Sequence, residues 1–256
     1  MPKVFLDYGH GGGDPGAVAG GYKEKDIVLA IGKRVKYHLE RHSFSVIESR
    51  SGDTNPSLES RSNMANANYV DVAVSLHCNS FTDKTAQGVE IYTYGQGNRE
   101  IGLAKAILNQ IIKAKLYTKN RGVKQANFHM VREIKTASVL LEMAFISNAE
   151  DRKILLNKQE QLAISITKGI LNFYEMRYYN EKQNTTEKLY KVQVGAFKER
   201  ANAERLANEL KSKGYSTYIT YTEKLYKVQV GAFREKANAE RLANELKSKG
   251  YSTYIV

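Results

Sequence analysis

Two histidines that end apolar runs are the residues of this sequence best placed for chemistry. His10 follows the apolar run 3–8 and opens a glycine-rich loop, and His77 ends the run 70–77. Open α/β sheets place their sites at the carboxyl edge of the strands, where both imidazoles would then lie. Glu24 stands at the start of a segment with helical apolar spacing and could reach the same edge. Two histidines and one glutamate, with water in the fourth position, are a catalytic zinc set. The alternative for His10 is an ordinary surface turn.

A fourth candidate is Glu142, the one charged residue in the run 138–146. A strand this apolar is expected to be buried on both faces, where a lone carboxylate is costly unless it is paired or near a metal. Glu142 could instead lie at an exposed end of the strand, still at the same sheet edge. Asp7 and Asp14 are weaker candidates, because Asp7 lies inside a strand and Asp14 precedes Pro15 in a turn.

Four further polar residues are candidates for secondary roles at this edge. Glu90 lies on a predicted strand and could reach the site, although an exposed position is the expectation. The candidates for holding substrate, each with a surface role as its alternative, are Arg50, Arg61 and His129.

The segments around these residues alternate between strand and helix patterns. Apolar or alternating runs predict strands over 3–8, 45–50, 70–77, 88–94 and 138–146. Apolar residues at helical spacing predict helices over 25–41, 57–68, 101–113 and 148–174. Alternation of this kind is typical of an α/β domain, a twisted and mainly parallel sheet flanked by helices, which we expect over residues 1–177.

Composition narrows the class of protein without identifying it. The chain has 256 residues, a formal net charge of +12 and one cysteine. An intrachain disulfide is therefore impossible, and Cys78 is expected to be a buried apolar residue that faces away from His77. The basic charge suits a polyanion: nucleic acid, an anionic membrane or an acidic cell wall. No segment is apolar enough to span a membrane, and the first strand begins too early for a signal peptide, so we expect synthesis in the cytoplasm.

The last third of the chain is a tandem repeat. Residues 187–220 return as residues 223–256, and the aligned pairs differ only at 198/234, 200/236 and 220/256. Each unit is predicted to form strand, helix and strand. One unit can bury little apolar surface, so the two should pack as one α+β domain of βαββαβ order over 187–256. The polar segment 178–186 is predicted to be a linker.

Four separated motifs resemble one family of enzymes. They are Asp7-Tyr8-Gly9-His10-Gly11-Gly12, Glu24, Ser75-Leu76-His77-Cys78-Asn79 and Leu141-Glu142-Met143-Ala144-Phe145-Ile146-Ser147-Asn148. In this order they resemble the zinc-dependent N-acetylmuramoyl-L-alanine amidases of the amidase-3 family over about residues 3–176. The resemblance implies zinc ligands at His10, Glu24 and His77 and a catalytic glutamate at Glu142. The sequence departs from the family at Tyr8, where proline is usual.

The C-terminal repeats resemble a SPOR domain, a peptidoglycan-binding module. The combination resembles sporulation cell-wall amidases and some phage endolysins, which implies action on the cell wall after release or lysis. We expect glycan strands stripped of stem peptides to bind the sheet face away from the helices. The residues expected on that face are Lys191, Gln193, Tyr218, Lys227, Gln229 and Tyr254.

Three other functions remain open from the sequence. The chain could be a wall-binding protein without turnover, or a zinc peptidase acting on the stem peptide. An RNA-binding protein is a third alternative, because the repeat shape is similar to RNA-recognition folds, although these stack bases on paired sheet aromatics. The preferred interpretation is an amidase that acts on peptidoglycan, with no nucleic acid or membrane partner.

Overall fold

The computed structural model describes residues 1–117, 119–179, 190–233 and 235–256. The chain forms two compact units, Met1–Tyr178 and Tyr179–Val256, and each is described by itself. Most of the predicted linker, 180–186, lies outside the described residues, as do 187–189 of the first repeat and position 234 of the second. Among the described helices, none is long and apolar enough to cross a membrane.

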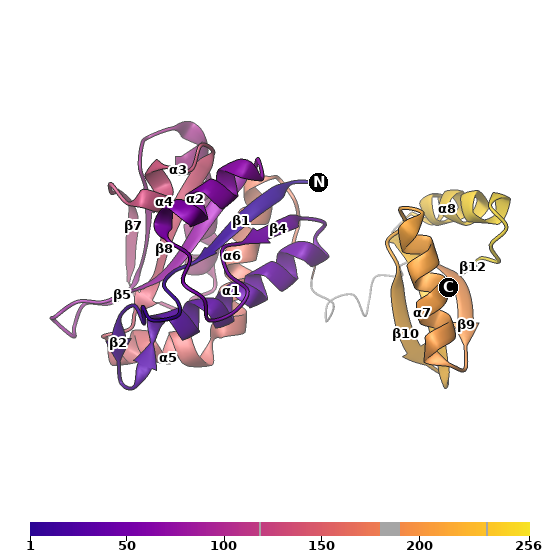
Figure 1. Ribbon diagram of the computed structural model, residues 1–256, viewed down its shortest axis with the longest axis horizontal. Coiled ribbons are helices and arrows are strands. Elements are labelled where there is room, and N and C mark those ends of the chain that lie inside the picture. The colour runs from indigo at the N-terminus through magenta and orange to yellow at the C-terminus, as the bar shows by residue number, and fades with distance from the viewer. Residues whose placement is uncertain (118, 180–189, 234) are drawn as a thin grey trace. The chain divides into compact units, whose positions relative to one another are not determined.

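The first unit contains a mixed sheet of six strands (Figure 1). The strand order is β4 (Ser45–Glu48), β1 (Lys3–Tyr8), β5 (Val72–Asn79), β8 (Ala137–Phe145), β6 (Val89–Thr93) and β7 (Asn120–Gln125). All neighbours pair in parallel except β8 and β6, which pair antiparallel. The carboxyl ends of β1, β5 and β8 therefore share one edge with the start of β6 and β7. The predicted α/β class with a mainly parallel sheet is confirmed.

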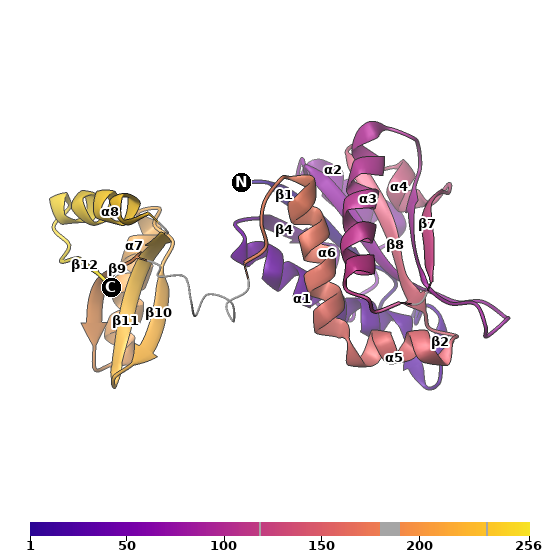
Figure 2. The same cartoon turned by 180° about the vertical axis from the view of Figure 1, so that it is seen from behind.

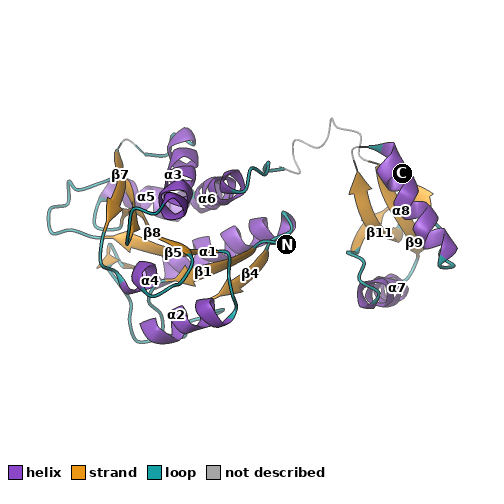
Figure 3. Ribbon diagram, turned by 90° about the horizontal axis from the view of Figure 1, so that it is seen from above, coloured by secondary structure: helices purple, strands orange, loops and turns teal. Residues whose placement is uncertain are grey.

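Helices cover both faces of this sheet, because its strands are apolar on both sides (Figures 2 and 3). On β1, Val4 and Leu6 belong to the large core beneath α1 (Glu24–Arg41), α3 (Asn98–Lys113) and α6 (Gln159–Phe173). Phe5 points the other way, into a smaller core that includes residues of α2 (Leu58–Ala67) and α4 (His129–Arg132). Alternation along the strand thus builds two cores. Cys78 lies in the larger core, as predicted.

Several parts of this unit differ from the sequence prediction. The helix predicted over 148–174 is two helices, α5 (Ala149–Asn157) and α6, because Lys158 leaves the helical conformation with φ −121°. No glycine or proline marks this break. The short hairpin of β2 (Val18–Ala19) and β3 (Tyr22–Lys23) was not predicted, and neither was β7, whose sequence is mostly polar.

The second unit is an antiparallel sheet of four strands backed by two helices. Its elements are β9 (Tyr190–Phe197), α7 (Arg200–Ser212), β10 (Tyr218–Thr222), β11 (Leu225–Phe233), α8 (Lys236–Ser248) and β12 (Tyr254–Ile255). The strand order is β10-β11-β9-β12, and the predicted small α+β domain is confirmed. Val192 and Val228 are fully buried against both helices, as the repeat pattern predicts.

The repeats are related by an approximate half-turn about an axis through the middle of the sheet. Gln193 pairs with its own copy, Gln229, across the central strands. On either side, Tyr218 pairs with Gln229 and Tyr254 pairs with Gln193. Equivalent positions of the two repeats therefore make equivalent contacts.

Candidate active site

Three side chains from separate elements meet at the carboxyl edge of the first unit's sheet. His10 follows β1, His77 lies near the end of β5, and Glu24 is the first residue of α1. Glu24 Oε1 lies 3.2 Å from Nε2 of His10 and 3.0 Å from Nδ1 of His77. One ligand atom from each residue lies within 4.8 Å of the other two. The sequence prediction placed these three residues together, and the fold does bring them into one cluster.

Two glycines make this close approach possible. A Cβ at Gly9 would lie 2.3 Å from the ring of His77. A Cβ at Gly16 would lie 2.6 Å from the ring of His10, and the backbone at Gly16 has φ +65°. Glycine is the residue that meets both demands at low cost, since it has no side chain and tolerates positive φ. The glycine-rich loop is thus a requirement of the cluster's geometry.

Neighbouring groups fix the orientation of Glu24 and His10. The backbone N–H of Cys78 donates to Oε1 of Glu24 at 2.8 Å, and the N–H of Ala17 donates to Oε2 at 2.9 Å. Asp14 Oδ2 lies 2.8 Å from Nδ1 of His10. A carboxylate in this position orients a metal-binding imidazole and leaves its other nitrogen free to bind the ion. The sequence suggested only a turn at Asp14, because its partner is set by the loop conformation.

The donor set fits a zinc ion. Tetrahedral ligands at zinc bond lengths lie about 3.3 Å apart, close to the 3.2 Å and 3.0 Å that separate Glu24 Oε1 from His10 Nε2 and from His77 Nδ1. The hydrogen bond with Glu24 raises the pKa of His10 to about 9, although burial opposes the shift. Burial raises the pKa of Glu24, but hydrogen bonds from His10 and His77 outweigh it and hold the pKa well below its ordinary value. The site therefore stabilises positive charge on the two histidines beside the carboxylate of Glu24. A zinc dication bound there would supply this positive charge in place of the protons on the two imidazoles.

Glu142 lies next to the cluster but is not one of its members. It pairs with His77 across β5 and β8, so the two side chains share a face of the sheet. Its Oε2 is buried and has no hydrogen-bond partner among the described residues. The pKa of Glu142 is raised to about 7, mainly by burial and also by the carboxylates of Glu24 and Glu90, while His77 opposes the shift. A carboxyl group with a pKa near neutrality can both accept and donate a proton.

The two arginines considered for substrate binding hold the loop before His10. Arg50 donates to the carbonyls of Tyr8 (2.9 Å), Gly9 (3.1 Å) and Lys25 (2.7 Å). Arg61 donates to the carbonyls of Tyr8 (2.6 Å) and His10 (2.8 Å) and pairs with Asp7 at 2.8 Å. The surface role considered for both arginines is wrong, because both side chains are buried and bonded within the protein. A role in holding substrate stays a prediction.

Of the two other sequence candidates, Glu90 has a different position from the one expected, and the role of His129 stays a prediction. Glu90 was expected to be exposed, but it is buried and lies beside Glu142, with which it pairs across β6 and β8. It forms ion pairs with Arg121 and Lys124 of β7, an unpredicted strand. His129 Nε2 lies 3.0 Å from the hydroxyl of Ser62 and connects α4 to α2.

Comparison with known proteins identifies the family. The sequence model described as N-acetylmuramoyl-L-alanine amidase, Amidase_3, matches residues 4–172. The chain belongs to this amidase family. A sporulation-specific N-acetylmuramoyl-L-alanine amidase of Bacillus subtilis is 37% identical over 222 residues, which cover 86% of this chain and 84% of that protein. An endolysin of Bacillus phage SPP1 is 36% identical, covering 65% of this chain and 62% of that protein.

Solved amidase structures share the fold of the first unit. The amidase AmiC2 of Nostoc punctiforme aligns with a TM-score of 0.65 and 34% identity, covering 68% of this chain and 97% of that one. The catalytic domain of CwlV from Bacillus (Paenibacillus) polymyxa aligns with a TM-score of 0.65 and 31% identity, covering 69% of this chain and 100% of that one.

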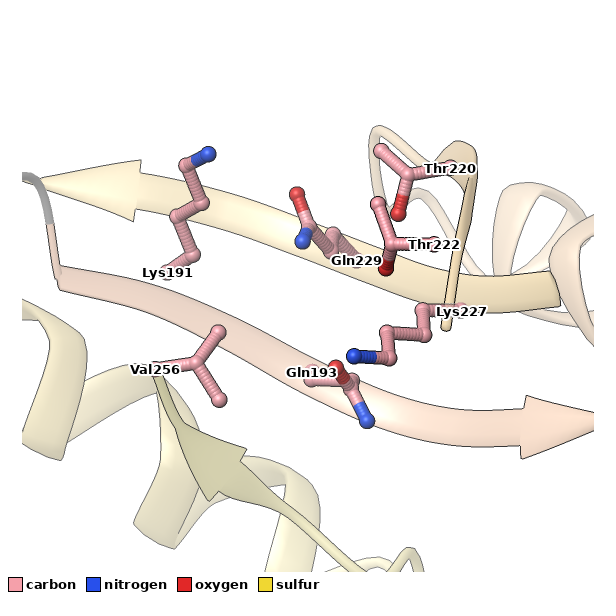
Figure 4. A pocket seen from close by; sticks show the side chains of 7 residues that line it. All are labelled: Lys191, Gln193, Thr220, Thr222, Lys227, Gln229 and Val256. Carbon is pink, nitrogen blue, oxygen red and sulfur yellow. The ribbon is translucent and has the colours of Figure 1, made fainter. Parts of the chain in front are cut away.

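The second unit of this amidase is a SPOR domain, whose family model matches residues 186–256. SPOR domains bind peptidoglycan. Four of the six residues predicted to contact glycan line one recess of about 320 Å³ with Thr220, Thr222 and Val256 (Figure 4). These four are Lys191, Gln193, Lys227 and Gln229. Tyr218 and Tyr254 do not line the recess, but they are exposed and lie opposite the two glutamines on the same face.

Proposed function

We propose that this chain is a zinc-dependent amidase that hydrolyses the bond between N-acetylmuramic acid and the L-alanine of the stem peptide in peptidoglycan. The observation that carries the proposal is the cluster of His10, Glu24 and His77. Beside it, on the adjacent strand, Oε2 of Glu142 is buried without a hydrogen-bond partner among the described residues. Membership in the amidase family and the names of its relatives support the substrate.

The three clustered residues would hold the zinc ion, which supplies a Lewis acid for the scissile carbonyl. Asp14 orients His10, and the N–H groups of Ala17 and Cys78 orient Glu24. Glu142 acts as the proton carrier: it takes a proton from the attacking water and passes it to the amine that leaves. A carboxyl group that the protein holds near neutrality is suited to both transfers.

Mass spectrometry of digested peptidoglycan tests the bond that is cleaved. We expect free L-alanine amino termini and muramic acid with a free lactyl carboxyl group. Cleavage inside the stem peptide would indicate a zinc peptidase instead. Absence of any soluble product, measured as dye release from labelled wall, would indicate a wall-binding protein without turnover.

Glu142→Gln separates the proton carrier from the metal ligands. The amide keeps the size of the side chain but cannot accept the proton, so hydrolysis should fall by about 10²- to 10⁴-fold. Zinc content measured by elemental analysis should stay near one per chain, whereas His77→Ala should lose the ion. Loss of zinc in Glu142→Gln would make Glu142 a ligand, and near-normal turnover would move its role to another residue.

A further inference from the structure

A second polar recess lies on the side of Glu142 away from His10. We call it the basic recess. It has a volume of about 470 Å³, and its charged and hydrogen-bonding residues include Asn79, Glu90, Tyr92, Lys119, Arg121 and Lys124. None of these residues belongs to the candidate zinc site.

The position of the basic recess follows from the strand order. His77, Glu142 and Glu90 are paired neighbours on β5, β8 and β6, so they form a row across one face of the sheet. Arg121 lies on β7, the next strand along. Neighbouring strands are about 4.8 Å apart, which puts β7 roughly 10 Å from β8. An extended peptide advances about 3.3 Å per residue. A peptide that leaves Glu142 in this direction therefore reaches the recess with its second or third residue.

The charges in the recess are arranged to leave a cationic group available. Glu90 Oε2 accepts from Nε of Arg121 at 2.6 Å and from Nζ of Lys124, and Oε1 accepts from Asn79 and Tyr92. Glu90 is thus fully engaged. Arg121 uses only Nε in this contact, and its two terminal nitrogens have no hydrogen bond to any described residue.

The guanidinium of Arg121 is also held in place. Its carbon lies 5.0 Å from the centre of the Phe145 ring, and one quarter of the side chain is exposed. A guanidinium fixed by a carboxylate and an aromatic ring can bind a second carboxylate through two parallel hydrogen bonds. Asp83, the other acid at the recess, already accepts from the N–H and hydroxyl of Thr85.

The recess on the opposite side of the zinc cluster has a different character. Its volume is about 370 Å³, and Gly9 and Asp14, which contacts His10, line it beside the cluster and the Asp7–Arg61 ion pair. The rest of its lining is Asn55, Pro56, Ser57 and Leu58. These residues offer amide, hydroxyl and apolar surface. In the substrate the lactyl carboxyl is consumed in the scissile amide, so the saccharide carries no carboxylate there. The stem peptide does carry free carboxylates.

We propose that Arg121, supported by Lys124, binds a free carboxylate on the second or third residue of the stem peptide, with the saccharide on the α2 side of the zinc cluster. This inference rests on the proposed amidase function. It assigns the direction in which the substrate crosses the sheet edge.

Matched soluble muramoyl peptides test the inference in the full-length, zinc-loaded protein. One substrate has all carboxylates free, and two others have the carboxyl of the second or of the third residue converted to an amide. Hydrogen bonds to a charged group of this kind correspond to about a 10- to 100-fold effect. We expect kcat/KM to fall by that factor for one of the two amidated substrates.

Two variants connect the effect to the basic recess. Arg121→Gln should lower kcat/KM for the free acid and abolish the discrimination between acid and amide. Lys105→Gln removes an exposed cation from α3 and should keep the discrimination. If wild-type protein cleaves all three peptides equally well, or if Arg121→Gln still discriminates, the carboxylate site is refuted while the amidase function stands. If wild-type protein cleaves none of them, both proposals fail.

Discussion

Replacing Arg61 with methionine should destabilise the catalytic unit strongly without removing a candidate zinc ligand. Arg61 and Asp7 are almost inaccessible to solvent, with 3% and 2% of their side chains exposed. Burial alone would raise the pKa of Asp7, but Arg61 and the hydroxyl of Ser75 outweigh it and hold the pKa below its ordinary value. Methionine fills the space of the arginine stem but leaves this carboxylate buried without its cation. Removing one partner of a buried ion pair costs about 3–5 kcal/mol.

Differential scanning calorimetry of the full chain measures this loss. In a unit of this size each kcal/mol shifts Tm by about 2–4 °C, so the transition of the catalytic unit should fall by roughly 6–20 °C. The SPOR domain serves as an internal reference. Arg132→Met is a matched control, because Arg132 pairs with Glu133 at the surface, where an ion pair contributes at most about 1 kcal/mol.

The double variant Asp7→Asn/Arg61→Met tests the cause of the loss. Without a buried charge that lacks its partner, the double variant should recover much of the stability. A shift below about 3 °C in Arg61→Met would mean that solvent or another donor replaces the guanidinium. A double variant no more stable than the single one would assign the loss to the carbonyl contacts with the loop before His10.

Three further predictions concern other parts of the molecule. Hydrolysis should decline as the pH falls through the pKa of Glu142, because burial raises that pKa to about 7 and only the ionised carboxylate accepts a proton. The assignment would be contradicted if the acid limb of the pH–rate profile lay far from this range and stayed unchanged in Glu142→Asp. Gly32→Ala should lower stability by about 1–3 kcal/mol, since a Cβ would lie 2.2 Å from the buried ring of Tyr8; an unchanged Tm would mean that the ring can move aside. The Gln193→Ala/Gln229→Ala variant should bind amidase-treated peptidoglycan less than wild type in a pull-down assay, and equal binding would move the glycan site off this face.

The cluster of His10, Glu24 and His77 could be predicted from sequence because the two histidines end strongly apolar segments and Glu24 begins a segment of helical spacing. Because strands alternate with helices along the chain, the carboxyl ends of these strands are expected at one edge of the sheet. The glycines beside His10 indicate close packing there. Glu142 was recognisable for a similar reason: a single carboxylate in an apolar strand needs an explanation. In both cases a polar residue stands in an apolar segment or at its end, so the local sequence marks it as a residue that needs a partner in the folded protein.

The residues that sequence reasoning misplaced are those whose environment is set by distant partners. From sequence, Glu90 is expected to be an exposed strand residue. Its burial depends on Arg121 and Lys124, which lie more than 30 residues away in the chain and neutralise its charge. Arg61 lies on a polar helix, and only the arrangement of β1 beside α2 shows that its donors face inward. The break at Lys158 has no local signal either, since α6 packs against α1 and α3 after the chain has turned.

The half-turn symmetry of the SPOR domain affects how the domain can bind a polymer that has a direction. A glycan strand has a reducing and a non-reducing end, so it looks different when reversed. The sheet face that carries the predicted glycan-binding residues looks nearly the same after a half-turn. Gln193 pairs with Gln229 at its centre, and Tyr218 and Tyr254 occupy equivalent positions on its two sides. A strand laid across this face would find nearly the same partners in either direction. The exceptions are Thr220, whose counterpart is Val256, and Thr222, which lies between the repeats and has no counterpart. A domain of this kind can bind a glycan strand without selecting one direction of the strand over the other.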